Sequence, residues 1–233
     1  MSHRSPAVSA VPAALFAVAA LCAVPFDTVL AGVLIGVSGC AILLPAFEAL
    51  SGLRFPFRLH AQIAIFVAAA LLLGEWSGIY EAVPAWDLAL HLVSAAVLSV
   101  AGLGLALTLT GGTWPARRLW VAGVLAFGFS QMVGALWEVL EFGLDIGFGL
   151  NTQRSGLPDT MTDVIANALG GVWGAVAGTL ALAGRVAVVP AGLMLDTMAA
   201  NPVLWPRWRG PSGAQGEVRR PLAGEDGAFE GGR

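Results

Sequence analysis

The sequence predicts an all-α protein, a polytopic bundle of transmembrane helices with about six spans. Of its 233 residues 57% are hydrophobic and only 12% are charged, and the mean hydropathy is +0.79. A soluble domain is much less apolar than this. A bilayer core about 30 Å thick needs roughly 20 apolar residues per helical span, which leaves room for about six helices and short loops. We therefore expect one membrane domain over residues 1–204 and no separate soluble domain.

Six apolar runs, separated by turn-forming residues, supply the expected spans. Pro25, Pro84 and the stretch from Gly111 to Pro115 fall in the breaks, where a helix should end. The runs cover residues 7–24, 28–47, 59–74, 86–110, 119–142 and 161–183. The first run follows His3 and Arg4 and could instead be a cleaved signal peptide. We favour a retained helical hairpin because the second run begins almost at once.

The distribution of arginine predicts the orientation in the membrane. Apart from Arg154, the arginines fall on alternate loops and in the tail, which are occupied by Arg4, Arg54, Arg58, Arg117, Arg118 and Arg185. Cytoplasmic loops are the ones enriched in basic residues. Both termini should therefore be cytoplasmic, in a bacterial inner (plasma) membrane. The tail, residues 205–233, is rich in Gly, Pro and charge and is expected to be a disordered cytoplasmic extension.

The composition also narrows the class of partner. The net charge is −3 and no segment resembles a basic nucleic-acid-binding surface, so we exclude nucleic acid. The lipid bilayer is the expected partner. A homo-oligomer or an additional membrane partner stays open.

Acidic residues and one histidine gather at the predicted outer ends of the fourth, fifth and sixth spans. Each set is spaced by three or four residues, which places it on one face of its helix. The fourth span carries Asp87 and His91; the fifth carries Gln131, Gly134, Glu138, Glu141 and Asp145; the sixth carries Asp159, Asp163 and Asn167.

Small residues indicate which way the acidic face of the sixth span points. Asp163 and Asn167 continue along the helix into Gly170, Gly174 and Gly178. Such small-xxx-small ladders allow two membrane helices to approach closely. The sixth span is therefore expected to turn its polar groups towards the interior of the bundle.

Buried carboxylates in a membrane need compensation, and the sequence offers little of it. One carboxylate near the bilayer centre costs roughly 2.5 to 3.5 kcal/mol, and only His91 and Arg154 are available to neutralise six acids. Shared protons, a bound divalent cation or a water-filled vestibule would each solve the problem. An oxygen-rich ligand set with one imidazole suits Mg²⁺, Mn²⁺ or Ca²⁺ better than a structural zinc, although Zn²⁺ stays open.

From these patterns we predict roles for individual residues. The expected metal ligands are Asp87, His91, Glu138, Glu141 and Asp163, supported by Asn167, Asp159 and Arg154. Glu138 and Glu141 could also act as general acid and base, with His91 as a proton relay.

Several polar residues also have a purely structural interpretation. Asp145, Asp159 and Glu81 could simply face water at the interface, and Asp159 could cap a helix that starts at Thr160. Asn167 could instead join two helices by a hydrogen bond. On the cytoplasmic side, Glu48 and His60 are expected to be loop residues or a local pair.

The segments that carry these residues resemble a bacterial integral-membrane family of unknown function, the YjdF-like inner-membrane proteins. The matching segments are WDLALHL, ALWEVLEF and DTMTDVIANALGG, within a region from about Glu75 to Gly178. More distantly the sequence is similar to VanZ-like proteins, in which a His, an acidic helix end and an Arg followed by Asp, Asn and Gly recur. Arg154, Asp163, Asn167 and Gly170 would fill that last pattern. The YjdF-like resemblance implies an inner-membrane protein and no known activity.

Three functions follow as hypotheses. The first is an extracytoplasmic site that binds a divalent cation, in an enzyme acting on lipid or cell-envelope substrates. The second is a cation- or proton-coupled transporter, which the apolar sequence of the fifth span on the cytoplasmic side of Gln131 disfavours. The third is a structural or partner-binding subunit with a buried acidic network. The signatures of serine hydrolases, zinc proteases and phosphate loops are all absent from the sequence.

Overall fold

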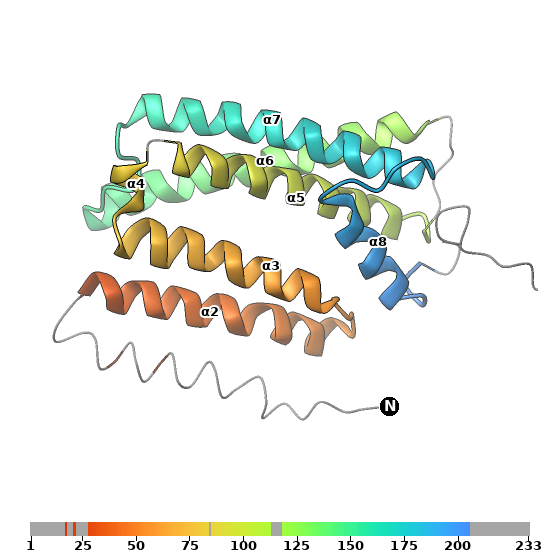
Figure 1. The fold of residues 1–233 in the computed structure, drawn as a ribbon, viewed down its shortest axis with the longest axis horizontal. Helices are drawn as coiled ribbons and strands as arrows, with labels where there is room; N and C mark the ends of the chain where they lie inside the picture. The colour runs from red at the N-terminus through yellow and green to blue at the C-terminus, as the bar shows by residue number, and fades with distance from the viewer. Residues whose placement is uncertain (1–16, 18–20, 22–27, 84, 113–117, 206–233) are drawn as a thin grey trace, which may run out of the picture.

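A computed structural model describes residues 17, 21, 28–83, 85–112 and 118–205, and these residues form helices and connecting turns without a strand (Figure 1). The first predicted span falls almost wholly outside this described part. Residues 206–233 also lie outside it, so the disorder of the tail stays a prediction. The all-α membrane architecture predicted from composition is confirmed.

Among the described residues, five helical stretches are long and apolar enough to cross a membrane. They correspond to the second to sixth predicted spans. The helices are α2 (Thr28–Ser51), α3 (Phe57–Val67), η1 (Ala68–Trp76), α4 (Ile79–Ala82), α5 (Trp86–Thr108), α6 (Leu119–Phe148), α7 (Leu157–Leu182) and α8 (Ala191–Ala200). The π-helix η1 continues α3 directly, so the two form one stretch, Phe57–Trp76.

The helices at the acidic end run further than the apolar runs predicted. α6 continues six residues beyond its predicted end to Phe148, and Gly149 stops it with a left-handed backbone at φ 68°. α7 begins four residues early, at Leu157. Pro158 fits there because the first helical turn does not need its missing N–H. Gly156 precedes the helix as its N-cap residue, and Pro158 lies in the first turn of α7.

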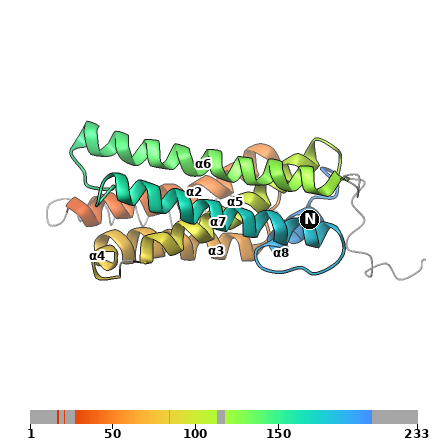
Figure 2. The same ribbon diagram turned by 90° about the horizontal axis from the view of Figure 1, so that it is seen from above.

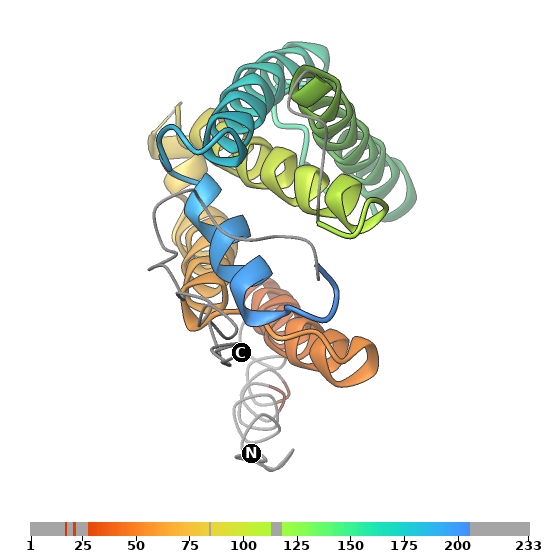
Figure 3. The same ribbon diagram turned by 90° about the vertical axis from the view of Figure 1, so that its right-hand side faces the viewer.

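The helices form two groups. α5, α6 and α7 pack against one another, and α2 with α3 and η1 forms a second layer beside them (Figure 1). The end-on view shows α8 crossing one end of the molecule between the two groups (Figure 3). Seen from above, α6 and α7 run alongside each other for much of their length (Figure 2).

The contact between α5 and α7 depends on glycine. A Cβ atom at Gly170 would overlap the carbonyl oxygen of Leu92, and one at Gly174 would overlap the carbonyl oxygen of Ala96. The Ser99 hydroxyl donates a 2.8 Å hydrogen bond to the Gly171 carbonyl at the same contact. The backbones approach so closely only because these positions lack side chains. The predicted inward face of α7 is thus confirmed.

α8, which the sequence analysis did not predict, ties the second layer to the three-helix group. Asn201, just after α8, accepts a 2.7 Å hydrogen bond from the Arg54 backbone N–H and donates one of 2.7 Å to the Arg54 carbonyl. Trp205 is buried in the same apolar cluster as Leu103 and Met198. Trp205 therefore belongs to the packed part of the chain, although the sequence placed the start of the tail there.

Glu48 and His60 form the expected local pair, with 3.3 Å between Glu48 Oε2 and His60 Nε2. The alternative that they are loop residues is wrong, because Glu48 lies in α2 and His60 lies in α3. The Glu48 carboxylate also accepts a 2.6 Å hydrogen bond from the Phe55 N–H, which shapes the turn between the two helices.

We expect Gly174→Ala to destabilise the protein by roughly 1 to 3 kcal/mol, because the added methyl forces α5 away from α7. Gly128→Ala is the matched control, since a Cβ there meets no atom within 4 Å. Thermal unfolding of both variants in detergent measures the difference. Equal melting temperatures would show that the α5–α7 contact is not limiting for stability.

Candidate metal centre

His91 is the centre of a group of carboxylates contributed by three helices. Its Nε2 atom lies 3.7 Å from Asp87 Oδ1 and 3.9 Å from Asp163 Oδ2, and its Nδ1 atom lies 3.9 Å from Glu138 Oε1. His91, Glu138 and Asp163 are buried, whereas the Asp87 side chain is 27% exposed. The sequence analysis predicted a group of five ligands, these four with Glu141, and the fold places these four beside one another.

The geometry of the group leaves several polar atoms without hydrogen-bond partners. All three distances from His91 exceed hydrogen-bonding range. Both carboxylate oxygens of Glu138, Asp163 Oδ2 and Asn167 Nδ2 are buried and have no partner among the described residues. Buried polar atoms in proteins almost always have partners. These unpaired oxygens therefore call for a positive ligand or for protons.

Three of the four residues are placed so that they could hold a single metal ion. One ligand atom from each of Asp87, His91 and Asp163 can be chosen so that all three lie within 4.8 Å of one another. Ligands at the usual 2.0 to 2.6 Å from one cation are themselves roughly 3 to 5 Å apart. The donor set, two carboxylates and one imidazole, therefore fits a metal ion without rearrangement of the helices.

Glu138 has a different position in the group. It faces Nδ1 of His91, whereas Asp87 and Asp163 both face Nε2. Metal-binding histidines commonly donate their second ring N–H to a carboxylate, which fixes the ring and its tautomer. The Gln153 side chain lies close by, because its Nε2 donates hydrogen bonds to the Glu138 backbone carbonyl at 3.5 Å and to Thr160 Oγ1 at 2.9 Å.

The remaining acids of α6 have other partners. Glu141, predicted as a ligand, accepts a 2.9 Å hydrogen bond from the indole N–H of Trp137 and is not among the ion-pair contacts of His91. Asp145 accepts hydrogen bonds from the N–H and hydroxyl of Thr152, at 2.7 and 2.6 Å, and from the Gln153 N–H at 3.0 Å. Asp145 therefore anchors the α6–α7 loop, which goes beyond the expectation that it merely faces water.

Asp159 does not cap α7. The helix already begins at Leu157, its N-cap is Gly156, and no side chain caps it. The predicted N-cap role was wrong because the helix starts three residues earlier than Thr160, with Pro158 in its first turn. Asp159 lies half-buried in the first turn of α7, at the same end of the bundle as Asp87.

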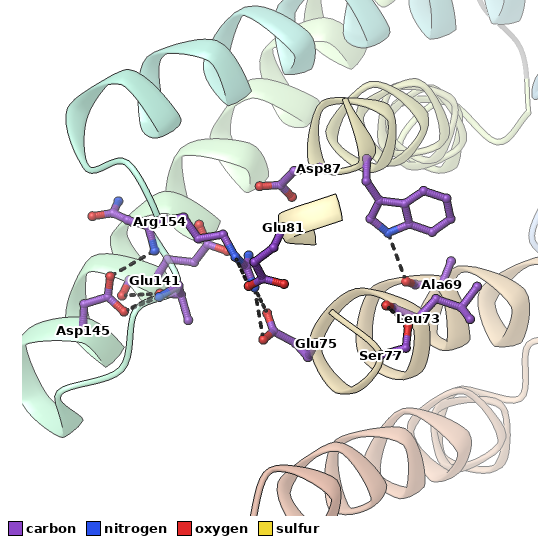
Figure 4. A network of polar contacts seen from close by, with 12 residues as sticks. Ala69, Leu73, Glu75, Ser77, Glu81, Asp87, Glu141, Asp145 and Arg154 are labelled. Carbon is purple, nitrogen blue, oxygen red and sulfur yellow. Dashed lines mark hydrogen bonds and ion pairs between the residues drawn. The ribbon is translucent and has the colours of Figure 1, made fainter. Parts of the chain in front are cut away.

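Arg154 joins the α6–α7 loop to the second layer. Its guanidinium lies 3.3 Å from Glu75 and 3.2 Å from Glu81, and stacks over the Tyr80 ring at 4.2 Å from the ring centre. Figure 4 shows Arg154 with Glu75 and Glu81, together with Asp87 from α5 and with Glu141 and Asp145 from α6. Arg154 is thus engaged outside the histidine group, although the sequence suggested it as a partner of the buried acids.

The charges in this cluster are well defined. Burial acts to lower the pKa of Arg154, but the charge of Glu75 and the hydrogen bonds to Glu81 outweigh it and raise the pKa. A hydrogen bond at its own backbone, followed by one from Arg154, lowers the pKa of Glu81. Burial raises the pKa of Tyr80, and the charges of Asp87 and Glu75 raise it further. Arg154 and Glu81 are therefore charged, and Tyr80 is neutral, at physiological pH.

Sequence reasoning missed Glu75, Tyr80 and Gln153 as parts of this region. Gly74 was one sign of the position of Tyr80, because a glycine close in sequence to an aromatic residue can mark a place where the ring packs against the backbone. A Cβ at Gly74 would overlap the Tyr80 ring, so glycine here lets the ring pack beneath Arg154. The loop residue Gln153 lies outside any periodic segment, and no pattern could have placed it.

We expect Arg154→Gln to loosen the α6–α7 loop, because the substitution removes the charge that holds Glu75 and Glu81. Faster hydrogen–deuterium exchange over residues 149–156 is the measurement. Arg58→Gln is the matched control, since Arg58 pairs with Asp196 at 3.0 Å in α8 and has no contact with this loop. Unchanged exchange in Arg154→Gln would contradict a bridging role.

The bridge should also depend on pH, with a defined sign. Because the folded-state pKa of Glu81 is lowered, its contribution is complete above the ordinary glutamate pKa of about 4.3 and is lost as pH falls through the lowered value. Exchange over residues 149–156 in the wild type should therefore rise only in that acidic range. Arg154→Gln should remove most of this dependence.

Comparison with known proteins gives a family and one relative. The family described as "Predicted membrane protein (DUF2238)" matches residues 7–184. A Thermotoga maritima protein described as "Uncharacterized protein" is 30% identical over 125 residues, which are 53% of this chain and 63% of the relative. The match therefore covers less than two thirds of that relative's length. No solved structure matches the chain.

Proposed function

The chain belongs to the DUF2238 family of predicted membrane proteins, and we propose that it is an integral membrane protein that binds a divalent cation at Asp87, His91 and Asp163. One observation carries the proposal: three ligand atoms from α5 and α7 converge within 4.8 Å, and Asp163 Oδ2 is buried without a hydrogen-bond donor among the described residues. A cation supplies the missing partner.

Charge balance supports the same proposal. The residues around His91 include three carboxylates, and His91 itself can contribute at most one positive charge. Arg154 is occupied by Glu75 and Glu81. Unpaired buried carboxylates cost several kcal/mol each unless they are protonated or matched by a cation. A histidine that ligates a cation through Nε2 is neutral, so a divalent ion would balance two of the three carboxylates and the third would hold a proton.

The donor set favours particular ions. Imidazole is a good ligand for Zn²⁺ and other transition metals, whereas Mg²⁺ and Ca²⁺ prefer oxygen alone. Two carboxylates with one imidazole therefore favour Mn²⁺ or Zn²⁺ over Mg²⁺ and Ca²⁺. The remaining coordination positions would be open to water or to an oxygen of a substrate.

Glu138 and Glu141 receive separate roles in this proposal. Glu138 faces Nδ1 of His91 at 3.9 Å, and a small approach on cation binding would let it accept the Nδ1–H and fix the ring, which leaves Nε2 for the cation. Glu141 lies on the same face of α6, one turn nearer the helix end, and is the candidate general acid or base. Asn167 and Asp159 support the site from the neighbouring turns of α7.

The side of the membrane and the substrate are also proposals. Arg54, Arg58, Arg118 and Arg185 lie near helix ends opposite to Asp87, as the helix bounds require. By the enrichment of basic residues in the cytoplasm, the metal centre would face the extracytoplasmic side. A cation there is suited to lipid or cell-envelope substrates, whose phosphate or carboxylate oxygens it would bind.

Transport is less well supported. Below the metal centre, Ser99 donates to the Gly171 carbonyl, Ser130 to the Ala95 carbonyl and Gln131 to the Asn167 carbonyl. These polar groups therefore satisfy the helix backbones. Among the described residues, the core beyond them is apolar, with Val100, Leu103 and Ala126.

The decisive experiment is metal analysis and cation-dependent thermal shift on the full chain purified in detergent. Chelator-treated wild type should gain several degrees in melting temperature with Mn²⁺ or Zn²⁺ and less with Mg²⁺ or Ca²⁺, because a ligand that binds only the folded state stabilises it. Asp163→Asn and Asp87→Asn should abolish that gain. Glu138→Gln should reduce it by weakening the orientation of His91.

Asp196→Asn is the matched control, because Asp196 lies in α8 and contacts Arg58. It should respond to cations as the wild type does. If no ion stabilises the wild type and Glu138→Gln alone lowers the melting temperature, the acids are a structural network and the proposal is wrong. If vesicles with the wild type conduct cations and vesicles with Asp163→Asn do not, the protein is a transporter and the metal-site proposal is wrong.

A further inference from the structure

A second feature lies at the opposite end of α5 from the metal centre. A cavity of about 240 Å³ opens between α5, α8 and the turn that joins α2 to α3. Its walls include Val97, Ala101 and Gly104 from α5, Met194 and Met198 from α8, and Trp205. The cavity is independent of the proposed metal site.

The size and lining of the cavity suit an apolar guest. The side chains around it are almost all aliphatic or aromatic, with Thr108 and Thr197 as the exceptions among them. An apolar protein cavity of about 150 Å³ is large enough to bind benzene. This larger one has room for a longer apolar group, and it lies along a membrane-length helix.

Trp205, one of the lining residues, has a buried polar atom without a partner among the described residues. Trp205 is only 5% exposed, yet its Nε1–H has no hydrogen-bond acceptor among the described residues. Buried indole N–H groups usually find an acceptor. A guest with apolar groups and one oxygen acceptor close to the Trp205 indole would fill the cavity and supply that partner.

Arg54 places a positive charge next to the cavity. Arg54 lies between Leu53 and Phe55, which both line the cavity, and Asn201 fixes its backbone. The Arg54 side chain is exposed and forms no ion pair within the described part of the chain, whereas Arg58 pairs with Asp196. Basic groups beside membrane-embedded pockets are suited to anionic lipid head groups.

We propose that this cavity binds one acyl chain of an anionic glycerophospholipid. The chain fills the apolar space, an ester carbonyl oxygen accepts a hydrogen bond from Trp205 Nε1–H, and the phosphate lies near Arg54. The residues that follow Trp205, PRWRGPSGAQ, bring little apolar volume apart from Trp208. These ten residues are therefore a poorer occupant than a lipid.

Native mass spectrometry of the full chain, delipidated in detergent and titrated with dioleoyl phosphatidylglycerol, tests the proposal. Wild type should retain one lipid, and should retain phosphatidylcholine less well. Gly104→Leu should lower occupancy roughly tenfold, since its side chain replaces the buried methylenes. A Cβ at Gly104 meets no atom within 4 Å, so the substitution fills space without a clash.

Gly128→Leu is the matched control, because Gly128 is exposed on α6, has equally open surroundings and does not line the cavity. Trp205→Phe should weaken retention of the ester lipid while leaving an ether-linked analogue unaffected. Equal lipid retention by Gly104→Leu and Gly128→Leu would overturn the proposal. The proposal would also be wrong if the wild type retained no lipid and Gly104→Leu changed the oligomeric state, which would indicate a second copy as the occupant. It would be equally wrong if the wild type retained no lipid and Gly104→Leu changed the protease sensitivity of residues 206–233, which would indicate the tail.

Discussion

The close approach of the α5 and α7 backbones is the constraint on which the rest of the structure depends. In a bilayer, helices associate mainly through van der Waals packing and a few hydrogen bonds, because lipid is as apolar as the side chains. Gly170 and Gly174 allow α7 to pack against the backbone carbonyls of α5, and the hydrogen bond from Ser99 to the Gly171 carbonyl stabilises the contact. This contact sets His91 beside Asp163. The chemistry of the acidic end therefore depends on glycines buried deeper in the bundle.

Much of this arrangement could be predicted from the sequence, because helical periodicity decides it. Asp163 and Asn167 share the face that carries the glycines, so their burial followed from spacing. Asp87 and His91 lie four residues apart at the start of a span, and Glu138 lies near the end of its neighbour. In a short-looped bundle these positions meet at one end. The YjdF-like resemblance agrees with the family found by comparison, whereas the VanZ-like resemblance gained no support.

The remainder could not be predicted because turns and tertiary contacts decide it. Arg154 was expected beside the buried acids, but the loop directs it to Glu75 and Glu81. Asp159 was displaced from its cap because Pro158 suits a first helical turn. Trp205 resembles a tail residue by composition, yet Asn201 and α8 carry it into the core. None of these outcomes has a periodic signal in the chain.

The bridge formed by Arg154 makes the helix contacts at the two ends of the molecule differ in their dependence on salt. η1 and α4 make little direct packing contact with α5 apart from the 3.3 Å hydrogen bond from the Trp86 indole N–H to the Ala69 carbonyl, and the ion pairs of Arg154 add to this limited contact. Attraction between partly exposed charges weakens as dissolved ions accumulate, with a screening length of about 8 Å at physiological ionic strength. The backbone contact between α5 and α7 involves no charged side chains and does not depend on ionic strength. The contact between the two helix layers beside the acidic residues should therefore loosen as the salt concentration rises. The contact between α5 and α7 should not change.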